Sequence, residues 1–456
     1  MPITVILENP SDLHNVERIC RACRVFGVTD VRVVLESTKP SDPRCQKAPD
    51  LSGSSADFRV VQSSTQCLKE LASGGPSPWR CFAATLEPGS VDLYTLDFAQ
   101  DSQVAIWFGQ EKHGLSPEAS EAAAVRFFIP TVGMVQSLNV AASLAVTLAE
   151  VCRQRLAAAS ARSHPLRLVP EVPDGKRGAD DVLLMEDAAL SSISQARIGK
   201  FLSVAKRRQR GLVLVLENPD RLDAAAILRS CDAFGAMEVH FIFEQVKAFD
   251  PLANRQVIKS EGSNLWVCHR VFTSVADCAD HLARQGFKSI AVGKATVAAT
   301  SVFDCDLTSD SQVALWLGRD GVLSESAASV VSAAVCIQPA VAGDSLVLSS
   351  SVAVILAEIA RQRRRAAEAP ASTTTTTATT TTTAAAAPAS TERWQLSPAE
   401  QKSYVNWCVA VHLKRHPAVE EENLTASNLE DGGEVDLSPE YQRLGNCRAK
   451  LARQGW

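Results

Sequence analysis

The sequence of 456 residues lacks any hydrophobic run long enough to cross a bilayer, and it lacks a recognisable targeting segment. It opens with "MPITVILENP", a strand-like pattern without a basic and then apolar stretch and without an Arg- and Ser-rich leader. Its 46% hydrophobic and 21% charged residues are ordinary for a soluble globular chain. We therefore expect no membrane partner and a cytoplasmic protein, with an organelle as the open alternative.

The sequence also lacks a paired arrangement of cysteines. Its 13 cysteines are scattered, mostly within apolar runs, and their odd number argues against a disulfide framework. Cys20 and Cys23 form one CxxC, which we interpret as two core-facing positions on a helix. Cys408, His412 and His416 share helical spacing, but three such residues are thin evidence for a metal site, and we expect no metal.

An excess of positive charge is missing too, since the net charge is −5. The distribution is nevertheless uneven: residues 194–211 contain no acid, and much of the acid lies at 420–436. A local basic patch is what phosphate binding requires, so we predict RNA contacts there, with a solvated helix face as the alternative. The basic residues of this stretch are Arg197, Lys200, Lys206, Arg207, Arg208 and Arg210.

Duplication is the strongest organisational signal in the chain. Three blocks recur in the same order, at offsets of 208 or 209 residues: 5–34 with 214–242, 101–116 with 310–324, and 129–143 with 337–351. We therefore predict two homologous domains and a tail. The boundaries are 1–158 for the first domain, 159–194 for a linker, 195–366 for the second domain, 367–392 for a Thr- and Ala-rich disordered tether, and 393–456 for a small helical and acidic region.

Each repeat alternates short β-rich runs with helical patterns, which favours an α/β fold with a mostly parallel sheet. In the first repeat, strands are expected at 4–9, 31–35, 81–86, 104–109 and 126–130, with helices at 15–27 and 137–155. Neither GxGxxG nor GxxxxGK[ST] is present, which removes the usual sequence argument for dinucleotides and NTPs. Composition and spacing alone indicate a duplicated α/β ligand-binding domain.

Three stretches carry a resemblance: "HNVERICRACRVFG", "IWFGQEKHGLS" and "FIPTVGMVQSLNVAASLAVTLAEVCRQR". They resemble the motifs N-x5-R, G-x-E-x-x-G-[LIV]-S and I-P-x-x-G-x-x-x-S-L-N of the SpoU/TrmH family of SPOUT RNA methyltransferases. The resemblance covers residues 3–155 and, more weakly, 195–365. The third motif is similar to the TrmH branch, which methylates the 2′-hydroxyl of a D-loop guanosine in tRNA.

The resemblance implies a trefoil-knotted α/β domain that binds S-adenosylmethionine in the knot and dimerises beside it. The knot would be an exception to the rule that chains are un-knotted. By position in the motifs, the cofactor would be held by the loops at 109–114 and 129–138. The implied cofactor-binding residues are Gly109, Gly114, Ile129, Pro130, Gly133 and Leu138.

The same resemblance assigns five catalytic positions. Arg21 would position the ribose 2′-hydroxyl or its phosphate and stabilise the oxyanion, because a guanidinium is almost never deprotonated. Asn15 would orient Arg21, and Glu111 would order the cofactor loop or hold Arg21. Ser137 and Asn139 would hydrogen-bond at the cofactor and ribose, with Ser137 also placed to cap the last helix. The purely structural alternatives are that Ser137 only caps the helix and that Glu111 only stabilises the loop.

The second copy keeps Arg229 and Ser345 but departs elsewhere. The differences are Asn15 to Asp223, Glu111 to Asp320, Pro130 to Gln338, Gly133 to Val341, and Asn139 to Val347. We therefore predict that it does not bind S-adenosylmethionine productively, and that it supplies the dimer interface and RNA-binding surface of an intramolecular pseudo-dimer. The predicted function is 2′-O-methylation of tRNA. The alternatives are an rRNA 2′-O-methyltransferase and a non-catalytic RNA-binding or ribosome-assembly factor.

Overall fold

The computed structural model describes residues 2–11, 13–36, 57–73, 78–111, 113–159, 193–251, 262–293, 299–308, 310, 312–340, 344–368 and 394–415. The predicted acidic tail, His416 and nearly all of the two predicted linkers lie outside these residues. We call residues 2–159 the first half and residues 193–368 the second half.

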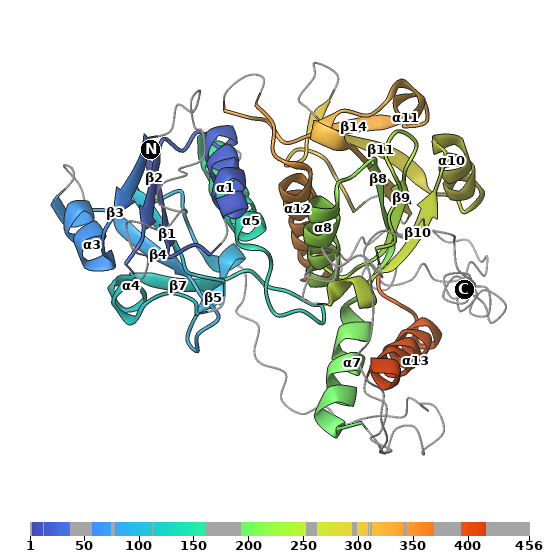
Figure 1. Cartoon of the computed structure of the whole chain (residues 1–456), viewed down its shortest axis with the longest axis horizontal. Coiled ribbons are helices and arrows are strands. Elements are labelled where there is room, and N and C mark those ends of the chain that lie inside the picture. Colours follow the sequence, from blue (N-terminus) through green and yellow to red (C-terminus); the bar gives the residue numbers. More distant parts are fainter. Residues whose placement is uncertain are drawn as a thin grey trace, which may run out of the picture.

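A seven-stranded sheet with parallel pairing forms the centre of the first half, at the left of Figure 1. Its order is β3-β2-β1-β6-β4-β7-β5. The strands are β1 Ile3–Glu8, β2 Asp30–Val34, β3 Asp57–Val61, β4 Arg80–Ala84, β5 Val91–Asp92, β6 Val104–Phe108 and β7 Val125–Phe128. The helices are α1 Leu13–Val25, α3 Ser64–Ser73, α4 Pro117–Ala122 and α5 Val140–Ala159.

The second half repeats this plan strand for strand, in the order β10-β9-β8-β13-β11-β14-β12. Its strands are β8 Gln209–Glu217, β9 Ala236–Ile242, β10 Cys268–Phe272, β11 Lys288–Gly293, β12 Thr300–Ser301, β13 Val313–Gly318 and β14 Ala333–Cys336. Its helices are α7 Gln195–Arg207, α8 Arg221–Ala233, α10 Val275–Arg284, α11 Glu325–Ser329 and α12 Leu348–Glu368, and α13 Pro398–Arg415 follows. The predicted α/β class and the duplication are confirmed, while the trefoil knot and the domain boundaries stay predictions.

Continuous apolar strands explain why helices cover both faces of each sheet. Every residue of β1 is buried, as expected for a parallel strand between two helical layers. Val5 and Leu7 face the core under α1 and α5, whereas Ile6 faces the smaller core under α3 and α4. Cys20 and Cys23 are both buried and unpaired, as the CxxC interpretation expects.

The two halves meet through helices. α5 packs on α12, with α1 against α5 and α8 against α12, in the middle of Figure 1. Buried residues of both halves belong to one hydrophobic core, and the guanidinium of Arg364 reaches the carboxylate of Asp92 at 2.7 Å across the boundary. The first half is therefore packed against the second by apolar burial as well as by polar contacts.

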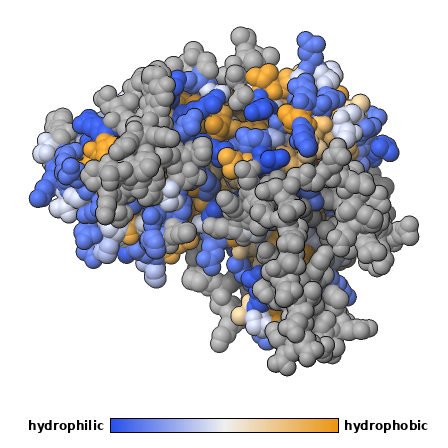
Figure 2. Space-filling model, in the orientation of Figure 1, coloured by the Kyte–Doolittle hydropathy of each residue, from blue (hydrophilic) through white to orange (hydrophobic). Residues whose placement is uncertain are grey.

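The described part of the surface mixes polar and apolar side chains. On the face in Figure 2, hydrophilic and hydrophobic side chains are interspersed. The exposed large hydrophobic residues include Val60, Leu86 and Val322, which lie on separate parts of the chain. Among the described residues, no helix is both long and apolar enough to cross a membrane.

Candidate functional site

The predicted site lies at the carboxyl edge of the first sheet, where open α/β sheets bind ligands. The loops that follow β6 and β7 meet there, because only β4 separates these two strands in the sheet. In the loop after β6, Gln110 and Gly114 exchange backbone hydrogen bonds of 2.9 Å. A Cβ at Gly109 would overlap the backbone of Gly114, and Gly114 itself has φ +72°. The closed shape of this loop therefore requires both glycines.

Three of the predicted catalytic residues form one hydrogen-bonded chain, which we call the amide relay: Glu111, Asn15 and Asn139. The side-chain amide of Asn15 donates to Glu111 Oε1 at 2.8 Å, and Asn139 Nδ2 donates to Asn15 Oδ1 at 3.0 Å. Asn15 is only 6% exposed, so both ends of a buried amide are satisfied. The relay fixes the rotamers of residues from three different motifs.

Glu111 is an ionised acceptor in this relay. Burial alone would raise its pKa, but hydrogen bonds from Ser11 and Asn15 outweigh burial, and the pKa lies below its ordinary value. The Ser11 hydroxyl donates to Glu111 Oε2 at 2.5 Å. Glu111 thus braces the loop after β6 against the start of α1, and no described contact joins it to Arg21.

The sequence interpretation of the last helix needs a correction. α5 begins at Val140 rather than near Ser137, and its cap is Asn139, whose Oδ1 accepts from Ala141 N at 2.9 Å. Ser137 precedes the cap and has a different partner. The guanidinium of Arg229, from the second half, donates to Ser137 O at 2.7 Å and to its hydroxyl at 2.9 Å.

Arg21 is not in the cluster where the sequence interpretation puts it. Its guanidinium crosses to the second half, where it donates to Ser345 O at 2.8 Å and to the Ser345 hydroxyl at 3.2 Å. The two halves therefore exchange arginines: each contributes one to the serine of the other. The sequence could not reveal this exchange, because it depends on how the halves pack.

The predicted cofactor loop, residues 129–138, contains backbone polar groups that could bind a ligand. The side chains of Ile129 and Leu138 face the hydrophobic core. Within the described part of the chain, neither the carbonyl of Ile129 nor the N–H of Leu138 has a hydrogen-bond partner. Unpaired backbone groups between glycine-shaped loops suit the edge of an adenine ring, so the residues present fit S-adenosylmethionine.

Gly133 has a different explanation from its neighbours in this loop. A Cβ there would overlap the backbone of Asp232, which belongs to α8 of the second half. Val132 N donates to Ala233 O at 2.7 Å in the same contact. The glycine is thus required by the packing of the halves, whatever it contributes to a cofactor. Pro130 lies half-buried at the start of the loop.

The equivalent place in the second half is small. A cavity of about 20 Å³ lies among Gly293, Leu317, Ile337, Ser345 and Leu346, where ~10–15 Å³ accommodates one water. Val347 stands at the cap position of α12 and has no side-chain acceptor to offer.

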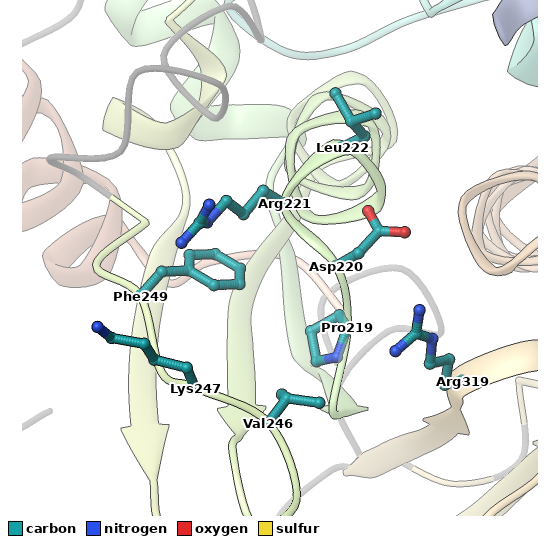
Figure 3. A pocket seen from close by; sticks show the side chains of 8 residues that line it. All are labelled: Pro219, Asp220, Arg221, Leu222, Val246, Lys247, Phe249 and Arg319. Carbon is teal, nitrogen blue, oxygen red and sulfur yellow. The ribbon is translucent and has the colours of Figure 1, made fainter. Parts of the chain in front are cut away.

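A larger hollow, of about 430 Å³, opens elsewhere in the second half, beside the start of α8 (Figure 3). In the first half Ser11 closes onto Glu111, whereas the matching Asp220 turns to its own helix and accepts from Asp223 N at 2.7 Å. Three cations and one carboxylate line the hollow, and the guanidinium of Arg221 lies 5.9 Å from the ring centre of Phe249. The cations are Arg221, Lys247 and Arg319.

The predicted RNA-binding residues on and after α7 fall into three groups. Lys206, Arg207 and Arg210 are exposed. Arg197 is half-buried over Phe201, and Lys200 donates to Met134 O at 2.8 Å. Burial and the neighbouring Arg197 lower the pKa of Lys200. Arg208 is fully buried, so its prediction as an RNA contact is wrong.

Sequence reasoning also missed Glu8. This buried carboxylate at the end of β1 accepts from the backbone N–H and the hydroxyl of Ser116, each at 2.6 Å. In the second half, Glu217 accepts from Ser324 N at 2.9 Å. The triplet "ENP" in both repeats was an available signal, because a carboxylate after an apolar strand needs a buried partner.

Comparison with known proteins agrees with this description. The model of the SpoU rRNA Methylase family matches residues 2–149 and 211–357. A tRNA (guanosine(18)-2′-O)-methyltransferase of Thermus thermophilus is 33% identical over 156 residues, which are 34% of this chain and 77% of that protein. The enzyme of the same name from Escherichia coli is 32% identical over 155 residues, covering 34% and 64%.

A solved structure, the A. aeolicus TrmH/SpoU tRNA modifying enzyme, is 28% identical, with a TM-score of 0.29, and covers 34% of this chain and 77% of that one. The two family matches coincide with the two halves, which confirms the predicted resemblance and the tandem duplication. This chain belongs to the SpoU rRNA methylase family.

Proposed function

We propose that the chain is an S-adenosylmethionine-dependent RNA 2′-O-ribose methyltransferase, and that its substrate is a D-loop guanosine of tRNA. The observation that carries this proposal is the amide relay, which orients residues of all three motifs at one sheet edge. The names of the relatives from Thermus thermophilus and Escherichia coli favour tRNA and that nucleotide.

The site is composite in this proposal. The first half supplies the amide relay and the cofactor loop, and the second half supplies Arg229 through its contact with Ser137. A guanidinium stays charged, so Arg229 holds the phosphate or the developing 2′-oxyanion rather than removing the proton as a free base. The role that the sequence interpretation gave to Arg21 passes to Arg229, and Arg21 belongs to the second-half contact.

S-adenosylmethionine would be held by the backbone of residues 109–114 and 129–138, and it supplies a methyl group that is already a good electrophile. The protein's task is then to align a weak hydroxyl nucleophile and to stabilise the charge that develops on it. Asn139 fits this task, because the amide relay and the helix cap fix its side chain from two sides.

The second half, in our proposal, stands where a separate partner subunit would stand, so that one chain forms a pseudo-dimer; further association of chains is compatible with this. RNA would lie over Lys206, Arg207 and Arg210, which are exposed on and after α7. The hollow of Figure 3 offers three more cations, which suit backbone phosphates.

Nucleoside mass spectrometry tests the function. Purified tRNA and rRNA are incubated with the protein and S-adenosylmethionine, and 2′-O-methylguanosine is mapped to its position. Methylation at the tRNA D-loop supports the proposal. Methylation of rRNA alone would favour the rRNA alternative, which the description of the family as rRNA methylases also suggests. Binding of RNA without binding of S-adenosylmethionine would favour a non-catalytic RNA-binding or ribosome-assembly factor.

A further inference from the structure

The cofactor loop of the first half is held from behind by groups that lie outside that half. Val135 N donates to Asp232 Oδ2 at 2.7 Å, in a fully buried contact. Met134 O accepts from Lys200 of α7, and Val132 N donates to Ala233 O. Three positions of the loop, residues 132, 134 and 135, are thus fixed by the second half.

Asp232 is itself held by a buried arginine. Arg208 and Asp232 are both fully buried and form an ion pair, and Arg208 Nη1 also donates to Asp232 O at 3.2 Å. Burial alone would lower the pKa of Arg208, but Tyr404 and Asp232 outweigh burial and raise it. The guanidinium therefore stays charged, and Asp232 presents one oxygen to Arg208 and the other to the cofactor loop.

Arg208 depends in turn on the C-terminal helix. Its Nε and Nη2 donate to the hydroxyl of Tyr404 on α13, at 2.9 and 2.6 Å, and its guanidinium lies 5.0 Å from the Tyr404 ring centre. α7 and α13 lie side by side (Figure 1). The side chain of Met134 from the cofactor loop is buried in their shared apolar cluster, together with Phe201 and Tyr404.

In the described part of the second-half loop, which leaves out residues 341–343, the contacts differ. Ala340 N donates to Val25 O at 2.7 Å, which mirrors the bond from Val132. The position of Asp232 is taken by Arg24, which is 33% exposed and reaches Asp344 at 2.7 Å. α7 and α13 also lie outside both ranges matched by the family. Part of the support for the first-half loop therefore comes from helices outside the matched ranges.

We propose that Asp232 is a positioning residue for the S-adenosylmethionine loop, and that the C-terminal helix sets the affinity for the cofactor through Tyr404 and Arg208. This inference rests on the proposed function for the identity of the ligand. Its physical basis is that groups behind a ligand-contacting element fix its geometry, and that a buried carboxylate needs its charged partner to remain in place.

The experiment compares Asp232→Asn and Tyr404→Phe with Asp344→Asn, the matched control from the mirrored pair. Isothermal titration with S-adenosylmethionine gives the affinity, and hydrogen exchange of residues 129–138 gives the stability of the loop. We expect about tenfold weaker binding for Asp232→Asn and roughly threefold for Tyr404→Phe, with KM for RNA unchanged. Exchange in the loop should rise in both variants, and the control should match the wild type.

Tyr404→Phe keeps the ring and its burial, so it remains informative if Asp232→Asn fails to fold. Wild-type affinity and unaltered loop exchange in a folded Tyr404→Phe protein, together with folded Asp232→Asn of normal affinity, would overturn the inference. An effect of Asp344→Asn as large as that of Asp232→Asn would overturn it too. If the wild type binds no S-adenosylmethionine, the proposed function fails, whereas hydrogen exchange still reports on the support of the loop.

Discussion

The ends of the loops that follow β7 and β14 enter their helices in the same way but differ in the side chain at the cap. In the first half, Asn139 caps α5 and holds Asn15 of the amide relay. In the second half, Val347 occupies the equivalent position at the start of α12. Its carbonyl accepts from Ser351 N, as the carbonyl of Asn139 accepts from Ser143 N. The helix start therefore needs only the shared backbone hydrogen bond. The polar side chains of the first loop are not required for it.

The second half contributes polar groups to the loop of the first half. Arg229 reaches Ser137, and Asp232 reaches Val135, both in the first half. The mirrored residues are Arg21, which reaches Ser345, and Arg24, which reaches Asp344. The two sets of contacts therefore match at the arginine–serine pairs and differ at Asp232 and Arg24. The following variants test this asymmetry.

Arg229→Ala against Arg21→Ala is the sharpest test. Removing a donor that stabilises a developing oxyanion costs about 10²–10³ in kcat, so we expect a loss of that size for Arg229→Ala. Arg21→Ala should change kcat less than about threefold, because it removes a contact of the polar-poor site. Single-turnover methylation of tRNA measures both.

Equal losses in the two arginine variants would contradict the assignment, and a larger loss in Arg21→Ala would reverse it. Thermal unfolding serves as the control for packing, since each arginine donates two hydrogen bonds to a serine of the opposite half. Because the two sets of contacts match, the two variants should lose similar stability.

The residues at the two helix-cap positions, Asn139 and Val347, offer a second test. Asn139→Ala should lower the free energy of unfolding by about 1 kcal/mol, and Val347→Asn should raise it by up to that amount. Asn139→Ala also breaks the amide relay, so we expect about a tenfold fall in kcat/KM. Val347→Asn should leave activity unchanged, and urea unfolding with steady-state kinetics separates the two effects.

Much of the fold was predictable because its signals are local. Apolar runs placed β1, β4, β6 and β7 within a few residues, and the repeats placed the second half. The amide relay was also within reach, since its members follow strands or open a helix within one domain. The start of α5 was misplaced because Ser137 and Asn139 are both acceptable caps.

Contacts between distant segments were beyond the sequence. The basic run around Arg208 predicts a uniform solvated or RNA-binding face, yet Arg208 is buried by Tyr404, 196 residues further along the chain. An arginine occupies the same position in both repeats, as Arg21 and Arg229. The repeats do not show which group either arginine contacts. Which serine an arginine meets is decided by the packing of α5 against α12.

The hollow of the second half predicts a smaller effect, on RNA alone. Arg319→Ala should raise KM for tRNA by about threefold and reduce the slope of log affinity against log salt by roughly one, as loss of one phosphate contact does. The affinity for S-adenosylmethionine should not change. Arg284→Ala, an exposed arginine on α10 outside the hollow, is the matched control. Identical salt slopes in both variants would remove the hollow from the RNA-binding surface.

The smallest effect comes from two carboxylates with opposite pKa shifts. Hydrogen bonds lower the pKa of Glu111 below 4.5, so its contribution to stability is present above its unfolded pKa and is lost as the pH falls through the folded pKa. Burial, with the nearby Asp220, raises the pKa of Asp223 above 3.8 despite Arg18, so its ionisation costs stability as the pH rises.

At neutral pH, Glu111→Gln should therefore destabilise the protein and Asp223→Asn should stabilise it. Both differences should shrink on acidification, and the effect at Glu111 should be a few tenths of a kcal/mol, because solvent screens an exposed side chain. Urea unfolding between about pH 7 and pH 3 measures both, and shifts of the same sign would show that the two equivalent regions do not differ electrostatically.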